Sequence, residues 1–270
     1  MHGTHPTGLT RPNPSASDHG GVAWHGWVAD AAEGGIGWHW LLQRGAGGYG
    51  LTMVSSDAAA DRGRRRFDVD ARSTAVVCVE CQEGVLGEHS VLPALRDDAR
   101  AVLPGIGRLV RAARAAGATV VHATFEGRLG ATDPGTAPLW RAIAPPTKGW
   151  APGHPDTQVL SGLLDPDDLV LARHHGLSPT WGTELLPVLR GRGVRTVVLA
   201  GVSLNVALLL AAGEIVHEGF RLVVPRDAVA GTPPEYGELV LRHTMAMLGR
   251  ITTVDELTAA WAELVGEGVK

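Results

Sequence analysis

The chain has 270 residues and a formal net charge of −4, with 28 acidic and 24 basic side chains. A chain of this length can bury the core of one sizeable domain and carry an extension. A slightly acidic balance gives no reason to expect nucleic acid or an anionic membrane as a partner. No apolar run reaches the roughly 18 residues of a membrane-spanning helix, and the N-terminus lacks a secretory signal pattern. Two cysteines in the whole chain favour a reducing compartment, which predicts a cytoplasmic protein.

Residues 1–68 differ in composition from the rest of the chain. They are rich in Gly, Ala and His, and the spacing of Trp24, Trp27, Trp38 and Trp40 predicts neither a helix nor a strand. Such a segment offers too little contiguous apolar surface to offset its ordering entropy, which predicts a disordered low-complexity extension. We expect one folded domain over residues 69–270. Ordinary composition begins near Met53, so we hypothesise that residues 1–52 come from an over-extended start site.

From Ser73 onward, apolar β-branched runs alternate with amphipathic segments. The predicted strands are 74–80, 119–125, 169–173, 194–200, 220–224 and 251–253. The predicted helical regions are 97–117, with an interruption at 104–105, then 180 or 181 to 192, 205–218, 234–248 and 254–265. Short runs without charge are typical of parallel strands covered on both faces. This alternation predicts a three-layer α/β/α sandwich with a mainly parallel sheet of about six strands.

Residues 200–231 connect the end of one buried strand to a helix and then to the next strand. Gly201 breaks the first strand, the helix is expected to start at Asn205, and Gly219 is placed to end it. The positions assigned to its apolar face are Val206, Leu209, Leu210, Gly213 and Val216. A helix that opens at the carboxyl end of a parallel strand presents free N–H groups and a positive dipole to a crevice.

Two segments resemble the signature of the isochorismatase-like cysteine hydrolases. They are Gly-Val-Ser-Leu-Asn-Val-Ala at 201–207 and Gly-Phe-Arg-Leu-Val-Val-Pro-Arg-Asp-Ala at 219–228. This family contains nicotinamidases, carbamoylsarcosine amidohydrolases and isochorismatases. The similarity covers about residues 73–258 and includes the strand Ala75–Gln82 and the segment Arg173–Leu185. It implies a non-proline cis peptide bond at Val202–Ser203 and a homo-oligomer, either a dimer or a tetramer.

The family's catalytic triad consists of Asp, Lys and Cys, and the matching positions here hold Glu80, Arg173 and Ala207. The methyl group of Ala207 cannot attack a carbonyl, which closes the thiol amidase mechanism. Arg173 cannot exchange a proton as lysine does, but its planar guanidinium holds a carboxylate well. We expect Glu80 and Arg173 to form an ion pair, with the backbone N–H groups of Ser203 and Ala207 available to an oxyanion.

Six further residues are assigned to substrate binding: Ser203, Gln82, His174, His175, Trp181 and Trp150. Ser203 either supplies its backbone N–H or replaces the nucleophile, and turn serines usually have a geometric role. His174 and His175 either carry protons or are structural loop residues. The loop-rich segment 127–155 is expected to cover the site.

Cys78 and Cys81 form a C-x-x-C pattern on a predicted strand. Positions i and i+3 of a strand point to opposite faces, which argues against a redox pair; Cys81 either fills the core or reaches the crevice. The zinc-dependent relatives place Asp-x-His after the second strand, and His122–Glu126 does not reproduce this pattern. We therefore expect no metal and no other cofactor.

Two functions remain open. The first is a hydrolase that acts on a small polar or carboxylate-bearing metabolite by acid/base chemistry without a cysteine nucleophile. The isochorismatases of the family dispense with the cysteine, so by this resemblance Glu80 is the acid and Arg173 binds a substrate carboxylate. The second is a catalytically inactive member that binds a metabolite or partners an active paralogue.

Overall fold

The computed structural model describes residues 38–45, 48–55, 69–127 and 135–267. The first two ranges are strands β1 (Trp38–Gly45) and β2 (Gly48–Ser55), which pair antiparallel. No strand is predicted here from the sequence, although Trp38, Trp40 and Leu42 do alternate with other residues. Met53 pairs with Trp40, so a chain that started at Met53 would lack β1. The rest of residues 1–68 lies outside the described residues.

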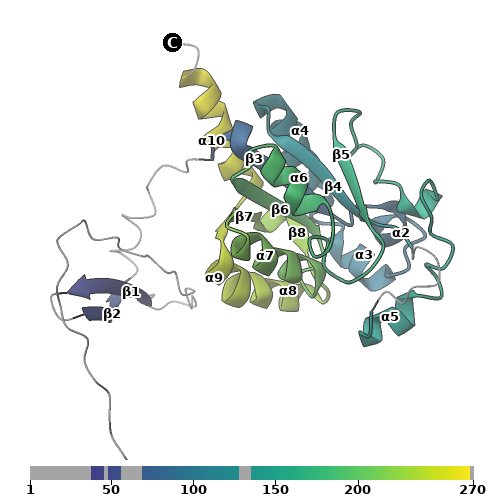
Figure 1. The fold of residues 1–270 in the computed structure, drawn as a ribbon, viewed down its shortest axis with the longest axis horizontal. Helices are drawn as coiled ribbons and strands as arrows, with labels where there is room; N and C mark the ends of the chain where they lie inside the picture. Colours follow the sequence, from purple (N-terminus) through teal and green to yellow (C-terminus); the bar gives the residue numbers. More distant parts are fainter. Residues whose placement is uncertain (1–37, 46–47, 56–68, 128–134, 268–270) are drawn as a thin grey trace, which may run out of the picture.

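The domain that follows is built on a parallel sheet of seven strands (Figure 1). Its strands are β3 (Thr74–Val79), β4 (Thr119–Phe125), β5 (Leu169–Arg173), β6 (Thr196–Val202), β7 (Arg221–Pro225), β8 (Val229–Ala230) and β9 (Arg250–Thr252). Their order is β5-β4-β3-β6-β7-β9, and the two-residue β8 pairs with β6. All these pairs are parallel, which confirms the predicted sandwich.

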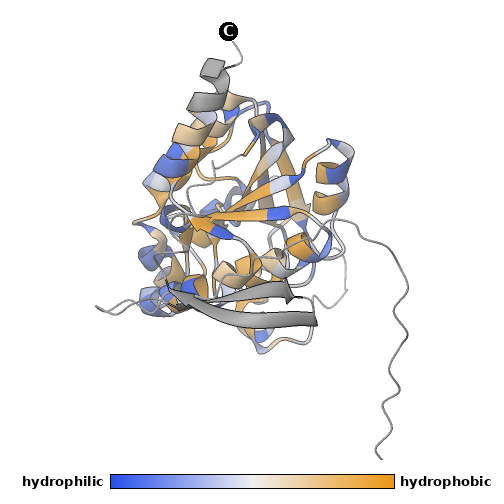
Figure 2. Ribbon diagram, turned by 90° about the vertical axis from the view of Figure 1, so that its left-hand side faces the viewer, coloured by the Kyte–Doolittle hydropathy of each residue, from blue (hydrophilic) through white to orange (hydrophobic). Residues whose placement is uncertain are grey.

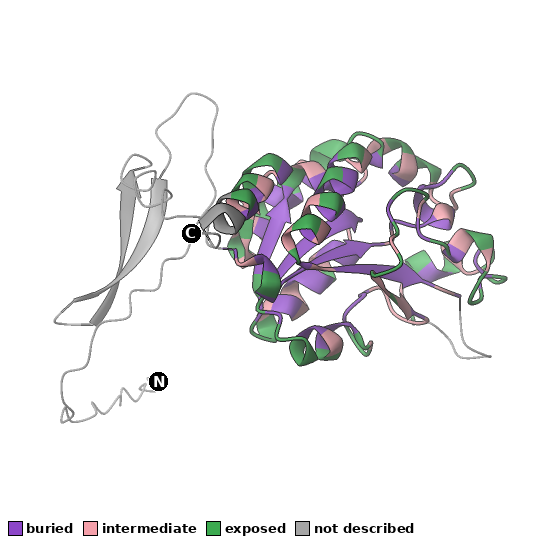
Figure 3. Ribbon diagram, turned by 90° about the horizontal axis from the view of Figure 1, so that it is seen from above, coloured by how far each residue is buried: buried purple, intermediate pink, exposed green. Residues whose placement is uncertain are grey.

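Helices cover both faces of this sheet, as Figures 1 and 3 show. The helices are α2 (Glu83–Leu86), α3 (Pro93–Ala99), α4 (Leu103–Ala116), α5 (Pro138–Ile143), α6 (Leu185–Gly191), α7 (Ala207–His217), α8 (Pro234–Val240), α9 (Ala246–Leu248) and α10 (Val254–Glu267). A π-helical turn, η4 (Leu241–Met245), joins α8 to α9, and short 3-10 turns lie at η1 (Ala71–Ser73), η2 (Pro155–Thr157) and η3 (Arg226–Ala228).

The core is divided by the sheet, because successive side chains of a strand point to opposite faces. On β3, Val76 and Cys78 pack with α4 and α10, whereas Val77 and Val79 pack with α6 and α7. The central strands β3, β4 and β6 are almost wholly buried, and the middle of the sheet is purple in Figure 3 and largely orange in Figure 2. β3 is buried along its whole length, as expected for a parallel strand covered on both sides.

Three helix predictions need correction. The predicted helical region 97–117 contains the end of α3 and the whole of α4, and Pro104 lies in the first turn of α4, where proline does not interrupt a helix. α7 starts at Ala207 and buries Leu208, Ala211 and Ile215, so the face predicted from Leu209 and Leu210 is wrong. This helix is apolar on nearly every side, and its pattern therefore does not determine which face meets the sheet.

α6 starts at Leu185, later than predicted. Gly182 adopts a positive φ of 66°, and the Ser178 and Thr180 hydroxyls bond to Glu214 on α7 instead of capping a helix. Residues 178–184 therefore form a loop held by tertiary contacts.

The topology brings two strand ends together in the middle of the sheet. From β3 the chain adds β4 and β5 on one side, and then returns to place β6 on the other side of β3. Ligands of open α/β sheets bind at such a reversal, outside the carboxyl ends of the strands. Here these ends are Val79 of β3 and Val202 of β6.

Candidate functional site

Glu80 follows β3 directly and has an unusual backbone conformation. Its φ is 54°, in the left-handed region that residues other than glycine rarely adopt. Its N–H donates to the Ala123 carbonyl of β4 at 2.9 Å, so the turn is fixed to the neighbouring strand. Strained residues of this kind cluster at functional sites. The conformation ends the strand and sets the direction of the carboxylate.

Arg173, the last residue of β5, reaches across the end of β4 to this carboxylate. Its Nη2 lies 2.5 Å from Glu80 Oε1, and the two side chains are only 5% and 12% exposed. The guanidinium carbon lies 4.9 Å from the centre of the Phe125 ring, and Nε donates to the Gly176 carbonyl at 3.3 Å. The expected proximity of Glu80 and Arg173 is therefore present in the structure.

One nitrogen of Arg173 is left without a partner. Among the described residues, no acceptor lies within hydrogen-bond distance of Nη1, although this atom is buried. A buried charged donor without an acceptor is costly. It is therefore a favourable contact point for an anionic or carbonyl oxygen that enters the site.

The turn between β6 and α7 supplies backbone donors. The Val202–Ser203 peptide bond is cis, at the expected position. Ser203 O accepts from Leu208 N at 3.0 Å, while within the described part of the chain the N–H groups of Ser203 and Ala207 have no protein acceptor. Ala207 is the first residue of the eleven-residue α7 and is 5% exposed. The positive end of the helix dipole adds to the attraction of this turn for negative charge.

Gln82 and Trp150 lie inside the protein. The Gln82 amide donates to the Phe125 and Asp156 carbonyls at 2.9 and 3.0 Å and accepts from Phe125 N at 2.7 Å, so both its N–H groups are used. Trp150 is 3% exposed, donates from Nε1 to Asp156 Oδ2 at 3.0 Å, and packs against Phe125 with ring centres 5.9 Å apart. These contacts fix Phe125, whose ring lies against the Arg173 guanidinium.

The loop after β5 carries the other three predicted residues. His174 Nδ1 lies 3.2 Å from the Gly127 carbonyl oxygen, and its Nε2 lies 4.0 Å from Glu126 Oε2. His175 meets Trp181 edge to face at 6.0 Å between ring centres, and Trp181 is 66% exposed. His174 therefore has an acidic neighbour at the end of β4, while Trp181 lies at the surface.

The two cysteines do not point to opposite faces, so that sequence argument is wrong. Cys78 and Cys81 belong to the same core cluster, because the left-handed Glu80 between them breaks the strand alternation. A hydrogen bond with the Cys78 thiol, together with burial, raises the pKa of the Cys81 thiol well above its usual value. Both residues are free thiols, and Cys81 fills the core.

Three contributors were missed by the sequence analysis: Phe125, Glu126 and Glu214. The sequence could have indicated Phe125 and Glu126. They are the last residue of β4 and the residue after it, and β4 lies between β3 and β5. Glu214 has none, because its hydrogen bonds to Ser178 and Thr180 join residues more than thirty positions apart.

In the ranges that the structure describes, no three His, Cys, Asp or Glu side chains converge as metal ligands would. Over the same ranges, no helix combines the length and the apolarity that crossing a membrane requires.

These features define an α/β protein with a polar centre at the topological reversal of a parallel sheet, and comparisons with known proteins agree. The family model "Isochorismatase domain" matches residues 74–256. The chain belongs to the isochorismatase family.

Curated relatives cover most of this domain. The uncharacterized isochorismatase family protein YecD of Escherichia coli O157:H7 is 29% identical over 205 residues, which are 72% of this chain and 99% of the relative. The ureidoacrylate amidohydrolase RutB of Stutzerimonas stutzeri is 25% identical over 232 residues, which are 80% of this chain and 93% of the relative. The crystal structure of a cysteine hydrolase from Pseudomonas syringae has a TM-score of 0.63 at 23% identity, and the match covers 73% of this chain and 96% of that one.

Proposed function

We propose that this isochorismatase-family protein is a hydrolase for a small metabolite that carries a carboxylate, and that it works by acid/base chemistry without a cysteine nucleophile. The observation that supports this most strongly is the buried Glu80–Arg173 pair, in which one guanidinium nitrogen lacks a partner. The relatives named as amidohydrolases make a hydrolytic reaction the natural class.

Arg173 is the proposed binding residue. Its Nη2 is engaged by Glu80, whereas Nη1 is free to take one oxygen of a substrate carboxylate. The Phe125 ring behind the guanidinium keeps its plane fixed. A planar fork of donors suits a carboxylate better than a lysine ammonium does.

Glu80 is the proposed acid/base. A substrate held by Arg173 lies next to Glu80, whose carboxyl group can carry a proton to it. That proton is then available to the leaving group of the substrate. The N–H groups of Ser203 and Ala207 are the proposed donors for negative charge that develops on the substrate.

The first test is the Glu80→Gln variant. The amide keeps the shape of the side chain but cannot transfer a proton, so we expect turnover to be lost while ligand affinity is largely kept. Turnover is measured over a panel of small amides, carbamoyl compounds and vinyl ethers such as isochorismate. Glu184→Gln, an exposed carboxylate at the start of α6, is the matched control. Unchanged turnover in Glu80→Gln would refute the proposal.

A second candidate function is supported by Ala207. With a methyl group at the position where the amidases of the family keep sulfur, the protein would bind a metabolite, or an active paralogue, without turnover. Saturable binding with no turnover over the whole panel, in the wild type as well as in Glu80→Gln, would favour this candidate. Wild-type amidase activity that iodoacetamide blocks would contradict both candidates, because neither uses a thiol.

A further inference from the structure

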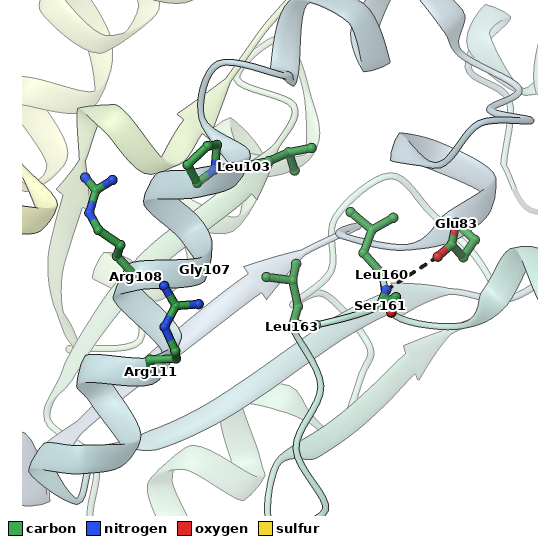
Figure 4. Close-up of a pocket in the computed structure, with 10 residues that line it drawn as sticks. Glu83, Leu103, Gly107, Arg108, Arg111, Leu160, Ser161 and Leu163 are labelled. Atoms are coloured by element: carbon green, nitrogen blue, oxygen red, sulfur yellow. Dashed lines mark hydrogen bonds between the residues drawn. The ribbon is translucent and has the colours of Figure 1, made fainter.

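A cavity of about 570 Å³ lies between α4 and the turn that precedes β5 (Figure 4). Its lining comes from three segments: Leu103, Pro104, Gly107, Arg108 and Arg111 of α4, residues 160–163 of the turn, and Glu83 at the start of α2. Glu80, Arg173, Ser203 and Ala207 do not line it. The cavity is therefore separate from the polar centre at the strand ends.

The wall on α4 follows one face of the helix, since positions 103, 107 and 111 are four residues apart. Gly107 makes room for the cavity. A Cβ atom there would lie 3.3 Å from Arg111 Nη1 and 3.9 Å from Leu163 Cδ2. The Arg111 guanidinium therefore lies back across Gly107 toward the turn.

The end of the cavity at α4 carries two arginines, Arg108 and Arg111. Arg111 is exposed, and within the described residues it forms no ion pair. Arg108 pairs with Asp227 and Asp255 at 3.6 and 3.7 Å, so its charge is shared with two carboxylates. The guanidinium of Arg111 is thus the one available to an anionic group among the described residues that line the cavity.

The opposite end is different. Glu83 Oε1 accepts from the Ser161 N–H at 3.5 Å, and Glu83 is the one acid among the described residues that line the cavity (Figure 4). Between the two ends the lining is apolar, with Leu103, Leu160 and Leu163 around the same space. A ligand that fits this order has one anionic head, an apolar body and no second negative charge.

We propose that this cavity binds a small monocarboxylate with an apolar body, its head on Arg111 and its body against Leu160 and Leu163. The volume lies within the usual range for small-molecule sites, about 300–1,000 Å³. Glu83 repels a second carboxylate at the far end, which gives the site selectivity against dicarboxylates.

The test is calorimetric titration of the full chain with three probes: octanoate, the dicarboxylate suberate and inorganic phosphate. We expect saturable binding of octanoate and at least about tenfold weaker binding of suberate and of phosphate. Arg111→Gln should weaken octanoate binding about tenfold or more, since hydrogen bonds to charged groups are the stronger ones. Arg111→Lys should keep part of the affinity.

Two variants complete the design. Glu83→Gln removes the repulsion and should bring suberate close to the affinity of octanoate. Arg192→Gln removes an exposed arginine beyond α6, on the other face of the sheet, and should change nothing. The proposal fails if folded wild type does not bind octanoate saturably, if Arg111→Gln binds it equally well, or if phosphate binds as tightly as octanoate.

Discussion

Glu80 and Arg173 are nearly buried charges, and each depends on the other. Removing one member of a buried pair leaves an uncompensated charge, whereas removing both leaves a polar but neutral site. The pair therefore contributes specificity to the site more than net stability. This difference between single and double substitution can be measured.

We expect Arg173→Met to lower the free energy of unfolding by about 3–5 kcal/mol, because it leaves the Glu80 carboxylate buried alone. The double variant Glu80→Gln with Arg173→Met should lose clearly less than the sum of the two single losses. Urea unfolding of the four proteins gives this coupling. Additive losses would mean that the two side chains do not interact.

A second buried charge cluster lies on β4, remote from the strand ends. His122 Nε2 lies 2.9 Å from Asp168 Oδ2, and Arg114 binds the same carboxylate through Nε at 3.0 Å. Burial lowers the pKa of His122 below 6.5, against the opposing effect of Asp168, and the Arg114 charge lowers it further. The folded protein therefore holds this histidine neutral.

This cluster predicts how stability depends on pH. As pH falls below 6.5, the unfolded chain protonates His122 before the folded chain does, so the free energy of unfolding falls from pH 7 toward pH 5. Burial disfavours the charged form of Asp168, but its bonds to Arg114 and His122 leave its pKa below 3.8, so it does not titrate in this window. His122→Gln should show a smaller fall than the wild type in urea unfolding at pH 7 and pH 5. Equal falls would contradict the prediction.

At the scale of the elements, close contacts decide what a glycine does inside a helix. Gly105 of α4 lies against η3, and a Cβ atom there would come within 2.1 Å of the Asp227 carbonyl oxygen. Gly213 of α7 has no atom within 4 Å of the same position. The close packing of α4 on η3 therefore requires glycine at position 105, whereas Gly213 only lowers the stability of α7.

Substitution of these two glycines should have opposite effects. Gly105→Ala should destabilise the protein by about 1–3 kcal/mol, because α4 must move away from η3. Gly213→Ala should stabilise it by about 0.5–1 kcal/mol, since alanine is the better helix former. Thermal unfolding of the two variants checks the sign of each effect. A stabilising Gly105→Ala would show that α4 does not pack tightly on η3.

Glu214 connects α7 to the loop that carries His174, His175 and Trp181. Its carboxylate accepts from the Ser178 hydroxyl at 3.0 Å and from the Thr180 hydroxyl, and both of these residues are buried. The position of the loop therefore depends on a residue of α7, which follows α6 and β6 in the chain.

Glu214→Ala should destabilise the protein by about 2–3 kcal/mol, because two buried hydroxyls lose a charged acceptor. Backbone amides of residues 174–184 should then exchange hydrogen faster. Glu218→Ala, which removes an exposed ion pair between the C-cap of α7 and Arg190 of α6, should cost less than about 1 kcal/mol. Unchanged exchange in Glu214→Ala would mean that other contacts hold the loop.

For the whole molecule, the family match begins at residue 74 and the continuous core begins at the buried Val69. We predict that a fragment of residues 69–270 unfolds at the same temperature as the full chain, within about 2 °C. Circular dichroism during heating measures this. A drop of more than about 5 °C, which corresponds to roughly 1–2 kcal/mol for a domain of this size, would show that the preceding residues belong to the domain.

Much of the fold follows from local patterns. The strands 119–125 and 169–173 have the predicted bounds, and the parallel sheet follows from the alternation of short apolar runs with helices. The proximity of Glu80 and Arg173 was also predictable, because both close parallel strands and such ends meet at one edge of the sheet. Hydrophobic periodicity carries this information, since it records which side of each element is buried.

The sequence by itself thus determined the class of fold, the family and the two charged residues of the polar centre. Tertiary structure alone decided the buried face of α7, the meeting of Cys78 and Cys81, the unpartnered Nη1 of Arg173 and the cavity beside Arg111. Each of these depends on a left-handed residue or on contacts between segments far apart in the chain. Local periodicity cannot encode such contacts, because it records the burial of single elements and not which elements meet.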